Sequence, residues 1–267
     1  MHVYFPQWQG SGYSDEIRQG AEIIKSFYSQ VSFVQIPLSE IEIIRKNNII
    51  GYDALIEQLS RFRSKIEELR PDQIFTVGGD CGLEVVPVSY LNAKYTKKFA
   101  VLWLDAHADL NTPSESPSNH FHGMPVRTLL GGGDVSFDRL MFSTLSAHQV
   151  FYVGLRSLDD PERKYIDDNK IYHSSTIDVQ ELCDLIHQFG FEHLYIHLDL
   201  DILDPDEFAF TKYQVPYGVR ISQVEELIKC FSSDFKVVGA SVLESTTTDK
   251  KQLDPIKNIL ELIASNF

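Results

Sequence analysis

The chain has 267 residues, of which 43% are hydrophobic and 23% are charged, the proportions of an ordinary globular protein. Its 38 acidic and 24 basic residues give a net charge of −14, which argues against a general nucleic-acid or anionic-membrane binder but leaves room for a small cationic substrate. No apolar run reaches the ~20 residues of a transmembrane helix, and the start of the chain lacks a signal-peptide pattern. Cys81, Cys183 and Cys230 are far apart, so we expect no disulfide framework and a cytoplasmic protein.

Taken in chain order, the hydrophobic pattern alternates helices with strands. Apolar residues spaced by three and four predict a helix over residues 52–69, ended by Pro71. Short apolar runs predict strands at 74–77, 99–104, 150–153, 194–198 and 237–243. Further helices are predicted over 178–189, from Ser222, and from Asp254-Pro255. Because the strands are apolar throughout, we expect a parallel sheet covered by helices on both faces, in one doubly wound α/β domain.

Three of the predicted strands end in polar clusters. Asp80-Cys81 follows the strand at 74–77, residues 105–109 follow the strand at 99–104, and residues 199–204 follow the strand at 194–198. The carboxyl ends of parallel strands share one edge of a sheet, which is where α/β proteins build their sites. If the chain stays extended, alternation points Asp105, His107 and Asp109 the same way. Burying so many carboxylates is costly unless cations pair with them, so the pattern predicts a metal centre.

The number of candidate ligands indicates two divalent ions rather than one. A single Mg²⁺ takes only one or two carboxylates and keeps several waters. Two-metal sites hold their ions roughly 3.5–4 Å apart, and imidazole together with carboxylate favours Mn, Fe, Co, Ni or Zn over Ca. An alternative for Asp80 and Asp204, each taken alone, is that the carboxylate caps a helix or turn. Capping does not account for His107 between two carboxylates.

These motifs resemble those of the ureohydrolases, the arginase family. The resemblance extends over residues 70–250 and rests on Gly-Gly-Asp-Cys at 78–81, Asp-Ala-His-Ala-Asp at 105–109, His-Gly-Met-Pro at 122–125, Asp-Leu-Asp-Ile-Leu-Asp-Pro at 199–205, and Glu244. It implies a three-layer αβα sandwich with a central, mostly parallel sheet. It also implies that residues 1–267 form a single catalytic domain.

The resemblance assigns a role to each polar residue of the motifs. It implies two Mn²⁺ ions bridged by Asp105 and Asp199, with Cys81 and Asp109 completing one ion and His107 and Asp201 the other. The implied nucleophile is a hydroxide that bridges the metals. Glu244 pairs with the substrate guanidinium, and His122 carries a proton to the leaving amine, since an imidazole titrates near neutral pH.

Two loops are implied to recognise the amino-acid end of the substrate. The resemblance places Asn111 and Ser118 at the α-carboxylate, and Asp159 with Glu162 at the α-ammonium. It therefore favours arginine, converted to ornithine and urea, over a decarboxylated amine such as agmatine. The alternative interpretation is that Asn111 begins a turn and that Asp159 begins a helix.

Cys81 departs from the family pattern, because the family usually has a metal-binding histidine there. A thiolate is softer than imidazole and adds a negative charge, which shifts the metal preference from Mn²⁺ toward Fe²⁺, Co²⁺ or Zn²⁺. A branch of the family that releases hydroxyurea from N-omega-hydroxyarginine also has cysteine here, although His122 is kept in this chain. The alternatives are that Cys81 is no ligand, or that the protein binds metal and amino acid without turnover.

Two further expectations concern the pocket and the assembly. Residues 210–218 carry bulkier side chains than the small-residue stretch usual at this place, so we expect a reshaped pocket wall. The resemblance also allows a homo-oligomer, because many members are trimers or hexamers, but no feature of the sequence sets the assembly. The expected partner is a small guanidino amino acid.

Overall fold

The computed structural model describes the backbone of residues 1–267 and, apart from Lys97, their side chains. Its centre is an eight-stranded sheet with the order β2-β1-β5-β10-β9-β6-β7-β8, in which every neighbouring pair is parallel. The strands are β1 (His2–Phe5), β2 (Val34–Gln35), β5 (Ile74–Gly78), β6 (Phe99–Leu104), β7 (Val150–Val153), β8 (Tyr172–Ser174), β9 (His193–Asp199) and β10 (Lys236–Leu243). A separate antiparallel pair is formed by β3 (Arg45–Lys46) and β4 (Ile49–Ile50).

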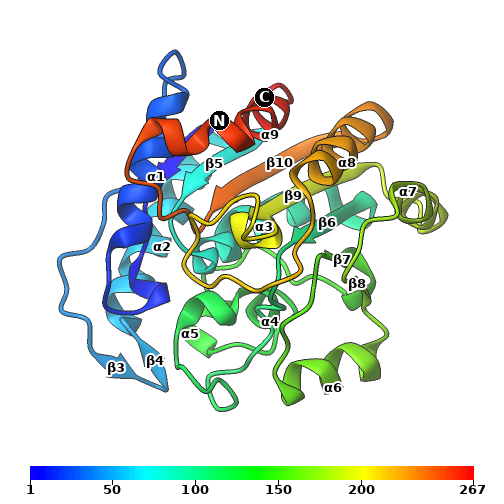
Figure 1. The fold of residues 1–267 in the computed structure, drawn as a ribbon. Coiled ribbons are helices and arrows are strands. Elements are labelled where there is room, and N and C mark those ends of the chain that lie inside the picture. The colour runs from blue at the N-terminus through cyan, green and yellow to red at the C-terminus, as the bar shows by residue number, and fades with distance from the viewer.

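Helices cover both faces of the sheet, so the protein is the expected three-layer α/β sandwich (Figure 1). One apolar core lies between the sheet and α2 (Tyr52–Leu69), α3 (Val85–Tyr95), α4 (Pro125–Leu129), α5 (Val135–Asp138) and α6 (Asp160–Asn169). The other lies between the sheet and α1 (Glu16–Phe27), α7 (Val179–Gln188), α8 (Ile221–Asp234) and α9 (Lys257–Ala264). Alternation along β6 shows the division, because Trp103 belongs to the first core and Leu102 to the second.

The structure confirms the predicted core of the sheet and corrects several element ends. Helix α2 and strands β6 and β7 begin and end at the predicted residues. Helix α8 begins one residue earlier than expected, with a capping box between Arg220 and Gln223 rather than from Ser222. Pro255 lies inside a 3₁₀ helix, Lys250–Ile256, that precedes α9. Strands β1, β2 and β8 were not predicted, because each is short and lacks a long apolar run.

The strand order places the predicted site at one edge of the sheet. Strands β5, β10, β9 and β6 are consecutive neighbours, so the segments after their carboxyl ends lie side by side. These segments carry Cys81, Glu244, residues 199–201 and residues 105–109. The polar clusters therefore meet in space, although Cys81 and Glu244 are 163 positions apart along the chain.

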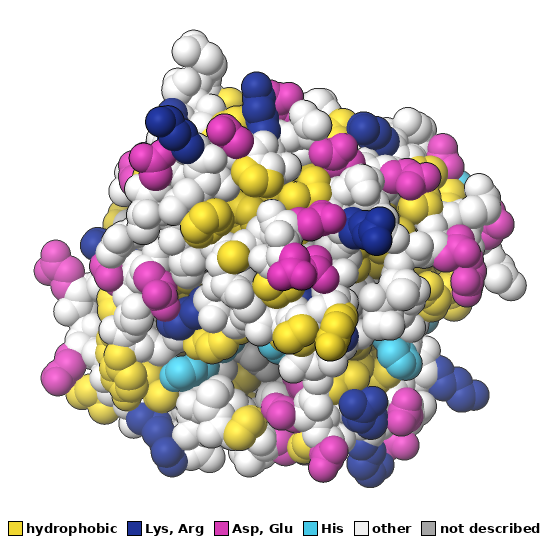
Figure 2. All heavy atoms as spheres, viewed as in Figure 1, with side chains coloured by type: hydrophobic (Ala, Val, Ile, Leu, Met, Phe, Trp, Pro, Cys, Tyr) yellow, Lys and Arg dark blue, Asp and Glu magenta, His cyan; other side chains and the backbone are white. Residues whose placement is uncertain are grey.

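The outer surface carries charges of both signs. Acidic and basic side chains are interspersed over the face drawn in Figure 2 rather than gathered in a basic patch. Among the described residues, no helix combines the length and the apolar character that crossing a bilayer requires.

Candidate metal centre and active site

The structure brings all six predicted metal ligands together in overlapping clusters. Cys81, Asp105 and Asp109 lie in one cluster with His197, and Asp105 lies in a second cluster with His107 and Asp201. A third contains Cys81, Asp199 and Glu244. Within each cluster one ligand atom per residue lies within 4.8 Å of the others. Asp105 and Cys81 each belong to two clusters, so the clusters form one continuous site.

The turn after β6 arranges its three ligands in an unexpected way. The chain does not stay extended, because His107 N donates to Asp105 Oδ1 at 2.7 Å and Asp109 has a left-handed φ of 52°. The turn directs His107 to Asp201, at 3.0 Å between Nδ1 and Oδ2, and directs Asp109 to the side of Cys81. Alternation along a strand is therefore not what assembles the site. Glu244, with a φ of 60°, is a second site carboxylate on left-handed backbone, which is a strained conformation that clusters at functional sites.

Asp80 and Asp204 have structural roles, as the alternative interpretation allowed. Asp80 is fully buried and accepts hydrogen bonds from Gln7 Nε2 at 2.8 Å, Gly10 N at 2.9 Å and Gly82 N at 3.0 Å. It thereby ties the N-terminal segment to the loop that carries Cys81. Asp204 accepts from Asp206 N at 2.9 Å within its own turn.

The electrostatics of the site favour a bound cation or bound protons over a set of bare carboxylates. Burial, and then neighbouring carboxylates, raise the pKa of Asp109 and Asp199 well above the usual value, and the same causes raise the pKa of the Cys81 thiol. Burial also acts on Asp105, but the neighbouring imidazoles of His107 and His197 lower its pKa below the usual range. Burial by itself lowers the pKa of His107, whereas its contacts with Asp105 and Asp201 raise it to about 12.

Unpartnered polar atoms show that divalent cations fit this site. Asp109 Oδ2, Glu244 Oε2 and His197 Nε2 are buried and have no hydrogen-bond partner among the described residues. Buried polar atoms are otherwise almost always paired, so these atoms have bonding capacity that a cation would satisfy. The cluster offers carboxylate oxygens, imidazole nitrogen and one sulfur, a set suited to first-row transition ions. Two ions would together balance the negative charge of the three overlapping clusters.

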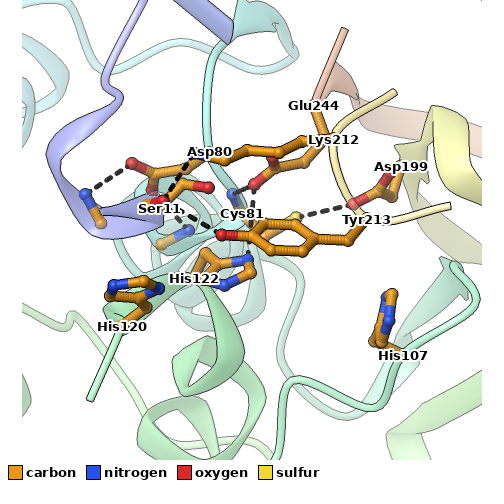
Figure 3. A network of polar contacts seen from close by, with 12 residues as sticks. Ser11, Asp80, Cys81, His107, His120, His122, Asp199, Lys212, Tyr213 and Glu244 are labelled. Atoms are coloured by element: carbon orange, nitrogen blue, oxygen red, sulfur yellow. Dashed lines mark hydrogen bonds and ion pairs between the residues drawn. The ribbon is translucent and has the colours of Figure 1, made fainter. Parts of the chain in front are cut away.

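Glu244 and His122 lie beside the metal cluster (Figure 3). Glu244 Oε1 accepts from Cys81 N at 3.3 Å and lies 3.7 Å from His122 Nδ1. Burial, followed by the charges of His120 and His107, lowers the pKa of His122 to about 3, so its imidazole is neutral at neutral pH. The predicted catalytic groups thus reach the same space as the predicted ligands.

The two loops predicted to bind the substrate are in contact with each other. Asn111 Nδ2 donates to Asp159 Oδ2 at 2.8 Å, and the buried Asn111 Oδ1 has no partner among the described residues. Both oxygens of Glu162 already accept a hydrogen bond, Oε1 from Leu110 N and Oε2 from Asp159 N, each at 2.9 Å. The contact with Asp159 N belongs to the capping box of α6, so Glu162 joins the helix start to the first loop. Ser118 is exposed and accepts from His120 N at 3.2 Å.

Residues 210–218, which we expected only to reshape the pocket wall, also cover the site. The ring of Tyr213 stacks on His122 with centroids 4.7 Å apart, and its hydroxyl donates to Ser11 O at 3.1 Å (Figure 3). Lys212 Nζ donates to the same carbonyl at 2.8 Å. The bulky residues expected to reshape the pocket wall therefore anchor the segment to the N-terminal part of the chain.

Arg156 holds this covering segment from the other side. Its guanidinium donates to the carbonyls of Gly154, Asp201, Ile202, Val215 and Pro216 at 2.7–3.2 Å. Arg156 follows the strand predicted at 150–153, but no local pattern around it indicates these contacts. His197 and Glu84, inside the apolar strand β9 and a 3₁₀ helix, were also not predicted.

Comparisons with known proteins agree with this geometry. The model of the arginase family matches residues 11–259. Arginase of Bacillus subtilis (strain 168) is 30% identical over 253 residues, covering 87% of this chain and 84% of that protein. Arginase of Staphylococcus aureus (strain MRSA252) is 27% identical over 210 residues, covering 74% and 69%. The crystal structure of Entamoeba histolytica arginase in complex with L-ornithine has a TM-score of 0.86 at 21% identity, covering 98% of this chain and 97% of that chain.

The match extends over nearly the whole chain and includes every segment that contributes to the clusters. The resemblance stated from the motifs is therefore confirmed, as is the fold expected from it. The chain belongs to the arginase family and is a hydrolase that acts on a guanidino group.

Proposed function

We propose that the protein hydrolyses L-arginine to ornithine and urea, as a single catalytic domain that holds two divalent cations, with Mn²⁺ as the expected metal. The observation that carries this proposal is the buried, unpartnered Glu244 Oε2 beside the carboxylate clusters. A guanidinium is planar and cationic and pairs with a carboxylate through charge-assisted hydrogen bonds. Glu244 would hold that group against the cations.

The reaction needs a strong nucleophile, because resonance makes a guanidinium a poor electrophile. When bound, the two cations supply an acidified water molecule for this purpose. Asp109 Oδ2 is free to hold the proton that the water releases. Tyr213, stacked over His122, limits the access of bulk water to the reacting group.

The leaving amine needs a proton, and His122 is the group placed to move it. Its imidazole is neutral in the metal-free protein, and because its pKa is low it would hold a proton only briefly before passing it to the leaving amine. His120 lies 5.9 Å away between ring centroids, and both side chains are partly exposed. The two rings would form the proton path.

The amino-acid end of the substrate would lie at the contact between Asn111 and Asp159. Asp159 supplies a carboxylate for the α-ammonium, and Asn111 Oδ1 supplies a second acceptor. In the predicted role, Asn111 would meet the α-carboxylate through Nδ2, which has a second N–H besides the one that it donates to Asp159. Ser118 and Glu162 stay predictions, with Glu162 acting here through the orientation of Asp159.

Cys81 supports N-omega-hydroxyarginine as a second candidate substrate. Its sulfur lies 3.2 Å from Asp199 Oδ2, inside the carboxylate cluster. A thiolate at this position adds negative charge and weakens the acidifying effect of the cation. N-omega-hydroxyarginine has a less basic guanidino group and releases hydroxyurea, so its hydrolysis would depend less on a strongly acidifying cation than that of arginine.

The proposal is tested on untagged protein by measuring metal content together with product release. Arginine, N-omega-hydroxyarginine, agmatine and guanidinobutyrate are assayed with Mn²⁺, Fe²⁺, Co²⁺ and Zn²⁺ in turn. We expect two metals per chain and urea from arginine, lost in Asp199→Ala. Two metals without turnover of any substrate would leave a protein that only binds metal and amino acid. The cytoplasmic location and an assembly of several copies stay predictions.

A further inference from the structure

One imidazole in the metal cluster has no role in the proposed reaction. His197 lies on β9, two residues before Asp199, and is completely buried. Its ring stacks on Trp103 of the neighbouring strand, with centroids 3.6 Å apart and an angle of 12° between the planes. The stacking fixes the plane of the imidazole, so its two nitrogens point in defined directions.

The first of these nitrogens is paired with a carboxylate. His197 Nδ1 lies 2.9 Å from Glu84 Oε1, and Glu84 is itself completely buried. The Glu84 carboxylate also accepts from the hydroxyls of Tyr195 and Ser241. Since a carboxylate accepts, Nδ1 carries the proton and donates it to Glu84. This leaves Nε2 as the nitrogen available to a ligand.

The second nitrogen faces the cluster of Cys81, Asp105 and Asp109. His197 Nε2 has no hydrogen-bond partner among the described residues and lies 3.5 Å from Asp105 Oδ2. Two atoms bound to the same ion at adjacent positions are roughly 3 Å apart when each bond is about 2.1 Å. The observed separation is therefore close to that of two ligands of one cation. Apart from His197, this cluster offers only sulfur and oxygen.

We infer that His197 Nε2 is a ligand of the cation held by Cys81, Asp105 and Asp109, and that Glu84 orients it. The inference rests on the two-cation site of the proposed function. A metal-bound histidine commonly donates its other N–H to a carboxylate, which is the arrangement of His197 and Glu84. A neutral nitrogen also relieves the excess of anionic ligands around this ion.

The competing arrangement is that His197 keeps both protons and only donates to Asp105. The two arrangements differ in whether nitrogen is bound directly to the metal. The nitrogen ligand predicted for the other ion is His107, which is 31% exposed at its side chain and tolerates substitution better than a core residue. Replacing His107 therefore removes the contribution of its nitrogen to any measurement of nitrogen bound to the metal.

The experiment records nitrogen couplings by pulsed EPR of untagged, full-length protein loaded with one equivalent of Mn²⁺. In His107→Gln we expect a coupling from a directly bound imidazole. In His107→Gln/His197→Gln we expect that coupling to be absent and the Kd for Mn²⁺ to rise at least tenfold. Circular dichroism of the metal-free variants checks folding. A bound Mn²⁺ without nitrogen coupling in His107→Gln, or an unchanged coupling in the double variant, would overturn the inference.

A second variant keeps the test decisive if the double variant does not fold. Glu84→Gln in the His107→Gln background keeps the imidazole but weakens its orientation, and we expect Mn²⁺ to bind roughly 10- to 100-fold more weakly. Unchanged affinity would contradict the inference. If wild-type protein releases urea while His107→Gln lacks the coupling, the inference fails and the proposed function stands. If wild-type protein binds no metal, both fail.

Discussion

At the scale of single residues, the site contains some residues that the sequence motifs predict and others that they do not. Cys81, Asp105, Asp109 and Asp199 follow strand ends and could be predicted, because a cluster of polar residues after an apolar run is conspicuous. His197 could not, because it is one polar residue inside a buried strand. Only the stacking on Trp103 and the pairing with Glu84, which depend on the register of β6 and β9, reveal it.

Glu244→Gln tests the predicted contact with the guanidinium. The substitution keeps the shape of the side chain but removes the negative charge that pairs with the substrate. Hydrogen bonds to charged groups contribute about 1.5–3 kcal/mol, so we expect kcat/KM to fall roughly 10- to 100-fold. Steady-state kinetics measure this, with the exposed Glu226→Gln as control. Equal activity in both variants would show that Glu244 does not hold the substrate.

The site carboxylates also determine how stability depends on pH. Burial and neighbouring carboxylates raise the pKa of Asp109, Asp199 and Asp201 in the metal-free fold, whereas these groups have a pKa of about 3.9 when unfolded. Above about pH 4 the folded state therefore holds more protons than the unfolded state, and the free energy of unfolding falls as the pH rises.

We expect the metal-free protein to unfold at a higher urea concentration near about pH 5.5 than near about pH 8. Asp199→Asn removes one carboxyl whose pKa is raised, so it should reduce the difference in urea midpoint between the two pH values. Urea unfolding in the presence of a chelator measures both. If the free energy of unfolding rises between these two pH values, the pKa values of the site carboxyls are not raised in the folded protein.

At the scale of elements, the central strands were predictable and the edges were not. Strands β6 and β9 are buried on both faces, and the apolar run is unbroken in β6 and interrupted only by His197 between Leu194 and Leu198. Strands β2 and β8 are short edge strands with half-exposed residues, and only their pairing defines them. The position of residues 210–218 over the site depends on hydrogen bonds to the distant carbonyl of Ser11, which no local sequence pattern predicts.

Arg156 is the element-scale test, because one side chain holds two loops together. Lysine cannot reproduce the planar fork of donors, so Arg156→Lys should lose most of the five contacts. We expect a loss of roughly 1.5–3 kcal/mol in the free energy of unfolding and faster hydrogen exchange in residues 210–218. The exposed Arg163→Lys is the matched control. Identical exchange in the two variants would exclude this role.

At the scale of the whole molecule, bound cations should stabilise the fold. An ion at 100 times its Kd adds about 2.7 kcal/mol, which corresponds to a rise in Tm of about 5–10 °C per ion for a chain of this size. Asp199 lies in a cluster with Cys81 and Glu244, so Asp199→Asn should lose much of the rise. Thermal unfolding with and without Mn²⁺ measures the effect. An equal rise in the variant would place the ions elsewhere.

The strand order has a consequence for synthesis of the chain. Because β10 lies between β5 and β9, the sheet stays divided until residues 236–243 have been made. A ribosome-bound chain that has reached residue 201 already contains the six predicted metal ligands and His197, yet it lacks Glu244 and the strand that holds β5 against β9. High-affinity metal uptake should therefore begin only in nearly finished chains, and a captured ion would mark a molecule whose translation is almost complete.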